Sequence, residues 1–159
     1  MFNPDHSHRR YNPLIGDWIL VSPQRTKRPW HGEEQEPEPG DVQTSDAGTY
    51  LAPGATRANG EKNPNYAHTF VFDNDFPAMT IQEESEVFNE GDLLVARNES
   101  GLCRVVVYSP NPDDSFSRMS ADNIRRVIDV WADQYVELGS RDEINYVQIF
   151  ENRGSMMGA

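Results

Sequence analysis

A single segment of the chain carries a helical pattern, and it limits the folds that the other residues can build. Its apolar side chains recur at the three- and four-residue spacing of one helix face, at Ile124, Val127, Ile128, Trp131, Tyr135 and Leu138. Ser120 precedes this run as a candidate N-cap, and Gly139 ends it. The spacing predicts one long amphipathic helix over residues 121–139, whose apolar stripe packs into a core rather than binding a ligand.

The other apolar runs are short, rich in β-branched and aromatic residues, and bounded by turn residues. They cover residues 17–22, 69–73, 93–97, 103–108 and 145–150, and each predicts a strand. We expect the third and fourth runs to form an antiparallel hairpin, because only a short polar segment separates them. Several strands with one long helix indicate an α+β fold with a mostly antiparallel sheet.

The length of the chain favours one domain. A chain of 159 residues can close a single hydrophobic core and is short for two full domains. Residues 33–46 contain six acids and Val42 as their only large apolar side chain. Because such a segment buries little surface to offset its ordering entropy, we expect residues 33–46 to be a mobile acidic loop.

The sequence carries no sign of a membrane or secretory protein. No run reaches the roughly 18 consecutive apolar residues of a membrane helix, and residues 1–13 lack the apolar core of a secretory signal. We therefore expect a cytoplasmic protein with no membrane partner. Cys103 is the single cysteine, which excludes an internal disulfide framework and a CxxC zinc site.

The charge of the chain is unevenly placed. A net charge of −12 repels polyphosphate backbones, so nucleic acid is excluded as the expected partner. Residues 1–31 nevertheless hold five cations and two acids, a local charge of +3. Arg25, Lys27 and Arg28 follow the first predicted strand, where guanidinium groups can grip phosphate oxygens bidentately. The alternative, which composition alone favours, is that these cations pair with surface acids.

Polar side chains follow two other predicted strands. Asn74, Asp75 and Asn152 offer amide and carboxylate groups that can bind ribose hydroxyls or base edges. The alternative for each is a turn cap through an Asx hydrogen bond. No histidine is paired with Cys, Ser or Asp at a spacing typical of nucleophilic catalysis, so we predict structural or solvent-facing roles for His6, His8, His31 and His68.

Four segments together resemble one enzyme family. They are HRRYNPLIGDWILVSPQRTKRPW, LAPGATRANGEKNPNY, TFVFDNDFPA and YVQIFENRGSMMGA, and they match the family in order and spacing. This family is galactose-1-phosphate uridylyltransferase, a member of the histidine-triad-like superfamily. The resemblance implies a half-barrel sheet, and it implies transfer of UMP between UDP-glucose and galactose 1-phosphate through a covalent uridylyl-histidine.

The resemblance also implies which residues bind the UDP-sugar. The segment that contacts its phosphates and ribose matches Arg25, Thr26, Lys27 and Arg28. The nucleoside and further UDP contacts match Asn74, Asp75 and Asn152. The residues that look like walls of the uracil pocket are Leu51, Phe72 and Phe150.

Two departures from the family limit what this chain is expected to do. The family's nucleophile is the second histidine of a Ser-Asn-Pro-His-Pro-His segment that follows the position of Ala159, and this chain does not contain it. We therefore expect residues 1–159 to form an N-terminal domain that is incomplete at its C-terminal end, inactive alone and without a catalytic residue. Some members bind zinc, but here the ligand positions hold Thr49, Ala52 and Pro112, so no cofactor is expected.

Two other interpretations stay open. The chain can be a non-catalytic UDP-sugar-binding or scaffold fragment, or part of a related transferase that acts on adenylyl sugars. We also expect a homodimer, because a strand at residues 145–150 without a neighbour would expose an apolar edge to other chains.

Overall fold

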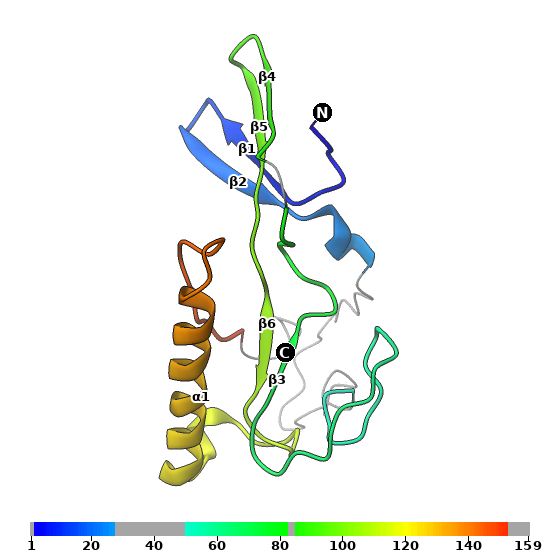
Figure 1. The fold of residues 1–159 in the computed structure, drawn as a ribbon, viewed down its shortest axis with the longest axis vertical. Coiled ribbons are helices and arrows are strands. Elements are labelled where there is room, and N and C mark those ends of the chain that lie inside the picture. Colours follow the sequence, from blue (N-terminus) through cyan, green and yellow to red (C-terminus); the bar gives the residue numbers. More distant parts are fainter. Residues whose placement is uncertain (1, 28–49, 83–84, 153–159) are drawn as a thin grey trace, which may run out of the picture. The chain divides into compact units, whose positions relative to one another are not determined.

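The computed structural model describes residues 2–27, 50–82 and 85–152. Contacts within the chain divide it into two compact units, each with its own part of the ribbon in Figure 1. We call the first the sheet unit; its described residues are 2–27, 73–82 and 85–105. We call the second the helix unit; its described residues are 50–72 and 106–152.

The sheet unit is built on a four-stranded antiparallel sheet with the order β2-β1-β5-β4. Its strands are β1 (His8–Asn12), β2 (Asp17–Val21), β4 (Val87–Glu90) and β5 (Leu94–Asn98), as Figure 1 shows. Gly16 and Gly91 occupy the two hairpin turns with φ angles of 76° and 61°, a region that glycine enters without steric strain. The strand predicted over residues 17–22 is confirmed as β2.

The predicted hairpin over residues 93–108 is wrong, although both of its strands exist. β5 pairs with β1 and β4, whereas β6 (Arg104–Val107) pairs with β3 (Phe70–Asp73) in a separate two-stranded sheet. The segment between β5 and β6 does not turn back because other segments pair with it. The amide of Glu99 donates to the carbonyl of Ser7 at 2.9 Å, and that of Gly101 donates to the carbonyl of Thr80 at 3.3 Å.

The predicted helix is confirmed as α1 (Ala121–Gly139). Its N-cap is the predicted one, because the Ser120 hydroxyl accepts a hydrogen bond from the Asn123 amide at 3.3 Å. A side-chain acceptor of this kind satisfies one of the amides that the first helical turn leaves unpaired.

The apolar stripe of α1 is only partly buried within the helix unit. Val127 is fully buried, and Trp131 stacks on Phe116 of the short helix η3 (Phe116–Arg118) with ring centroids 5.6 Å apart. Ile128 and Tyr135 remain 50% and 55% exposed. The stripe therefore supplies a small core on one side, as predicted, and leaves apolar surface on the other.

Residues 145–150 do not form the predicted strand. A strand exists only when its backbone pairs with a neighbour, and the described residues provide no neighbour for this segment. The predicted acidic loop, residues 33–46, lies outside the described residues. In the described part of the chain, no helix combines the length and the apolar character needed to cross a membrane.

Candidate functional site

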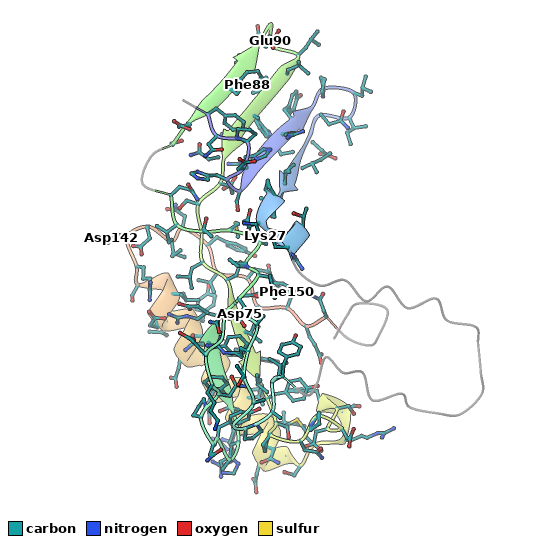
Figure 2. The ribbon with its side chains drawn as sticks, turned by 90° about the vertical axis from the view of Figure 1, so that its right-hand side faces the viewer. Lys27, Asp75, Phe88, Glu90, Asp142 and Phe150 are labelled. Carbon is teal, nitrogen blue, oxygen red and sulfur yellow. The ribbon has the colours of Figure 1, made fainter. Side chains whose placement is uncertain are left out.

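The predicted phosphate-binding segment follows β2 as a short helix, η1 (Pro23–Lys27). Pro23 fixes its first φ angle, and the Thr26 hydroxyl closes the turn by donating to the Pro23 carbonyl at 2.7 Å. Arg25, Thr26 and Lys27 are exposed, and neither cation forms an ion pair with a residue that the structure describes. Figure 2 labels Lys27 at the end of η1. Arg28 lies outside the described residues.

The remaining cations of the basic N-terminal segment have structural roles. Arg9 pairs with Glu99 at 2.6 Å, and its guanidinium lies 5.4 Å from the centre of the Trp18 ring. Arg10 donates from Nε to Nε2 of His8 at 3.0 Å. The alternative of pairing with surface acids thus applies to Arg9, while Arg25 and Lys27 have no acidic partner among residues 2–27, 50–82 and 85–152.

Asn74 and Asp75 lie in the sheet unit directly after β3. The Asn74 amide donates to the Cys103 carbonyl at 2.9 Å, and its side-chain Oδ1 accepts from the Phe76 amide at 2.9 Å. This is the Asx turn that the alternative interpretation expects. Because Oδ1 is engaged in the turn, the side-chain nitrogen Nδ2 is the group with which Asn74 can donate to a ligand oxygen.

A cluster of hydrogen bonds ties η1 to the loop that carries Asn74 and Asp75. Two hydroxyls donate to the Ala78 carbonyl, from Ser7 at 2.9 Å and from Ser22 at 2.7 Å. The side-chain nitrogen Nε2 of Gln24 donates to the carbonyls of Pro77 and Ala78, both at 3.2 Å. We call Ser7, Ser22 and Gln24 the polar clamp. It fixes the predicted phosphate-binding segment to the predicted nucleoside-binding loop within one unit.

Sequence reasoning missed the polar clamp. Its partners are 53 to 71 residues apart along the chain, so no local spacing announces them. The only available signal was the position of two polar residues, Ser22 and Gln24, on either side of Pro23 and immediately before the cations.

The first wall of the predicted uracil pocket, Leu51, lies in a turn of the helix unit. Asn63 is 3% exposed, and its Nδ2 donates to the carbonyls of Tyr50 at 2.9 Å and of Ala52 at 3.0 Å, one on each side of Leu51. The Tyr66 hydroxyl donates to the Leu51 carbonyl at 2.6 Å. Burial raises the pKa of the Tyr66 phenol above its usual value, so this donor stays protonated.

The second predicted wall, Phe72, belongs to a row of stacked side chains in the same unit. Tyr66 stacks on Phe70 with centroids 5.3 Å apart, and Phe70 stacks on Phe72 at 5.4 Å. The guanidinium of Arg57 covers the Phe72 ring at 4.2 Å while pairing with Glu61. Tyr66 therefore contacts the backbone of Leu51 directly and the ring of Phe72 through Phe70.

The structure does not group Phe150 and Asn152 with these walls. Phe150 is 73% exposed and stacks on no aromatic ring of the described residues, and Asn152 is exposed. The nine predicted residues that the structure describes therefore fall into two sets. Arg25, Thr26, Lys27, Asn74 and Asp75 lie in the sheet unit, and Leu51, Phe72, Phe150 and Asn152 lie in the helix unit.

His8 has the structural role that the sequence predicts. It is fully buried, its Nδ1 contacts the His6 carbonyl at 2.7 Å, and its Nε2 accepts from Arg10. Both nitrogens are therefore satisfied when Nδ1 carries the proton. His6 and His68 are exposed, and His31 lies outside the described residues.

The zinc positions of the family do not fit a metal in this chain. Ala52 and Pro112 have no ligand atom in their side chains, and Thr49 lies outside the described residues. Within residues 2–27, 50–82 and 85–152, no group of three or more His, Cys, Asp or Glu side chains is arranged to hold a metal ion.

A cavity of about 260 Å³ lies in the helix unit, and none of the predicted UDP-sugar-binding or uracil-pocket residues lines it. It is lined mainly by polar side chains, among them His68, Ser109, Asp114, Asn123 and Arg126. Asp114 accepts from the Ser109 hydroxyl at 2.5 Å and from Nδ2 of Asn111 at 3.1 Å. These bonds engage both oxygens of its carboxylate within its own loop.

Comparison with known proteins identifies the family. Residues 2–159 match the N-terminal domain of galactose-1-phosphate uridyl transferase. The chain is similar to curated galactose-1-phosphate uridylyltransferases from Rattus norvegicus, 45% identical over 97% of this chain and 40% of the relative, and from Kluyveromyces lactis, 42% identical over 97% of this chain and 45% of the relative. The relative from Haemophilus influenzae is 40% identical over 99% of this chain and 45% of its own length.

A solved structure described as "Structure of uridylyltransferase" shares the fold of the chain. It superposes with a TM-score of 0.51 at 23% sequence identity, covering 82% of this chain and 34% of that one. The chain thus spans less than half the length of these relatives. The match over residues 2–159 shows that the chain belongs to the galactose-1-phosphate uridylyltransferase family, in its N-terminal domain.

Proposed function

We propose that this chain supplies the UDP-sugar-binding part of an enzyme that transfers UMP between UDP-glucose and galactose 1-phosphate. The nucleophile is the second histidine of a His-Pro-His segment, which these 159 residues do not contain. The chain alone therefore binds substrate and does not turn it over. The sheet of the whole enzyme is the half-barrel of the histidine-triad-like superfamily.

The observation that carries this proposal is the joining of η1 to the loop after β3 by the polar clamp. Arg25 and Lys27 are exposed and have no acidic partner in the described part of the chain, yet the segment that bears them is tied through Gln24 and Ser22 to the loop of Asn74 and Asp75. Phosphoryl transfer depends on positioning and on neutralising the charge of phosphate oxygens, and fixed cations do both. Arg28 is the third cation of this segment in the sequence.

In this proposal the other predicted residues bind the nucleoside. Asn74 and Asp75 bind its ribose and base edge, and Asn152 makes a further UDP contact. Leu51, Phe72 and Phe150 form the apolar walls of the uracil pocket. Within the helix unit, the support for this assignment is that Asn63 and Tyr66 hold the backbone around Leu51. A pocket wall that is already held in place can pack against a flat base without first becoming ordered.

The test is calorimetric titration of the chain with UDP-glucose at low salt. Arg25→Ala combined with Arg28→Ala is expected to weaken binding by at least tenfold, roughly the loss of two charge-assisted hydrogen bonds. Arg118→Ala combined with Arg125→Ala is the matched control, because it removes two exposed arginines from the helix unit. Equal losses in both double variants would mean that only net charge matters, and the proposal would fail.

Two further measurements separate the open alternatives. Tighter binding of ADP-glucose than of UDP-glucose would favour the adenylyl-sugar transferase. Turnover of UDP-glucose and galactose 1-phosphate by the chain alone would contradict the proposed source of the nucleophile, and binding of neither nucleotide sugar would leave only a scaffold role.

A further inference from the structure

The polar clamp is a chain of donors that ends on two backbone carbonyls of the sheet unit. The Gln24 amide nitrogen donates to the Ser7 hydroxyl, which donates in turn to the Ala78 carbonyl at 2.9 Å. Consecutive hydrogen bonds of this kind polarise and strengthen one another. Ser7 is fully buried, so its hydroxyl has no exchange with solvent to replace a lost partner.

Gln24 differs from the two serines in where it lies. It is the residue of η1 immediately before Arg25, and the carbonyls that it contacts belong to Pro77 and Ala78, which follow Asn74 and Asp75 in one loop. The Gln24 side chain therefore links the segment that bears the cations to the loop that bears Asn74 and Asp75. Ser7 comes from outside both segments and serves as the fixed point between them.

The side-chain NH2 group of Gln24 makes the contacts that link the two segments. Its Nε2 makes all three contacts, whereas its Oε1 is buried and accepts no hydrogen bond from the described residues. A carboxylate in the same place would direct an oxygen at the two carbonyl oxygens, and neither the carboxylate nor the carbonyls can donate a hydrogen bond. The position thus requires a donor and not merely a side chain of this size.

We propose that Gln24 is a positioning residue, which sets the distance between the phosphate-binding cations and the nucleoside-binding loop through its donor contacts to Pro77 and Ala78. This inference rests on the proposed function, because it assigns the two segments to one UDP-sugar. Gln24 itself does not touch the ligand in this proposal. Its effect on affinity comes through Arg25 and Asn74, the groups that it holds together.

The experiment compares Gln24→Leu and Gln24→Glu with the wild-type chain, using Gln82→Leu as a matched control. Gln82 is in the same unit, but within the described part of the chain its side chain bonds only to Thr80, two residues away. The first readout is amide hydrogen exchange without ligand, measured in peptides that cover residues 22–27 and 76–79. Gln24→Leu is expected to speed exchange there and to leave α1 unchanged.

The second readout is the Kd for UDP-glucose at several pH values. Gln24→Leu is expected to raise Kd by about tenfold, as for the loss of an orienting hydrogen bond. Gln24→Glu should match it at pH 8 and regain affinity relative to wild type as the pH falls to 5, because a protonated carboxyl can donate to one carbonyl. The groups in contact with this side chain, Ser7, Pro77 and Ala78, do not titrate, so the recovery belongs to the new carboxyl.

The outcomes distinguish this inference from the function on which it rests. A wild-type chain that binds no UDP-glucose overturns the proposed function and the positioning role together. Wild-type binding with an unchanged Kd in Gln24→Leu overturns the role of Gln24 alone, as does a Gln24→Glu variant that shows no recovery at low pH. If Gln24→Leu does not fold, the pH series of Gln24→Glu gives the same comparison within one variant.

Discussion

Replacing Asn63 by alanine removes the two hydrogen bonds that hold the backbone on either side of Leu51. Nδ2 of Asn63 donates to the carbonyls of Tyr50 and Ala52, and the residue is 3% exposed, so water does not simply take its place. Two neutral hydrogen bonds contribute about 1–3 kcal/mol together. Asn63→Ala also removes an Oδ1 that is buried without a partner among the described residues, which returns roughly 1 kcal/mol.

The net expectation for Asn63→Ala is a loss of up to about 2 kcal/mol in the free energy of unfolding, or up to roughly 8 °C in Tm. The assay is thermal unfolding followed by circular dichroism at about 222 nm, where the signal comes mainly from α-helix, here α1 of the same unit. Asn65→Ala, at an exposed position two residues away, is the control and should shift Tm little.

A third variant, Asn63→Asp, tests the assignment by the order of the variants' stabilities and not by the size of one Tm change. Asn63→Asp keeps the shape of the side chain but turns the donor into an oxygen that faces two carbonyls, so it should be more destabilising than Asn63→Ala at neutral pH. Its Tm should then rise toward that of Asn63→Ala on acidification, as the carboxyl gains a proton to donate. An aspartate variant as stable as wild type at pH 7 would refute the assignment of Nδ2 as the group that holds this turn.

Three further predictions concern local features of the helix unit. Because burial raises the folded-state pKa of Tyr66 above that of the unfolded chain, its contribution to stability is complete below about pH 10 and is lost as the pH rises beyond it; Tyr66→Phe should flatten this alkaline fall in unfolding titrations. Ser120→Ala should cost about 1 kcal/mol in chemical denaturation, as for loss of an N-cap acceptor. Gly54→Ala and Gly60→Ala should each lower the free energy of unfolding by about 1–2 kcal/mol in the same assay, because both glycines have a positive φ. Gly54→Ala should cost more than Gly60→Ala. Its new Cβ would lie 3.2 Å from Oδ1 of Asn65, whereas a Cβ at Gly60 would meet nothing within 4 Å.

The parts of the fold that sequence predicted are those with local causes. Helix α1 has its N-cap, its periodic stripe and its terminal Gly139 within 20 consecutive residues, so nearly all the information is in one window. The strand β2 is likewise bounded by its own turn residues. The hairpin over residues 93–108 was mispredicted because pairing depends on distant partners. β5 joins β1 across about 90 residues of chain, and propensity alone does not select that partner.

Two strands were missed because their sequences lack an alternating apolar pattern. β1 has the sequence HRRYN and β4 has VFNE, and neither shows the apolar alternation that indicates a half-buried strand. β1 is stabilised by contacts that a sequence does not display. The ion pair of Arg9 with Glu99 joins it to the segment after β5, and the contact of Arg9 with Trp18 joins it to β2.

The candidate site divides in the same way. The cations of η1 and the Asn74 loop were named from their positions after strands and from the family resemblance, whereas Ser7, Ser22 and Gln24 were not named at all. Their bonds to Pro77 and Ala78 arise from folding the two segments together. Figure 2 shows Lys27 and Asp75 as labelled members of the two segments that this clamp connects.

The most direct test of a shared phosphate and nucleoside site is a titration of the ¹⁵N-labelled chain with UDP, followed by amide chemical shifts. We predict that the amides of residues 25–27 and of residues 74–75 shift together and give one common Kd. Galactose 1-phosphate, which lacks the nucleoside, should shift residues 25–27 and leave residues 74–75 in place. Shifts that appear in only one segment under UDP, or that saturate at two different concentrations, would contradict a single UDP site held by both.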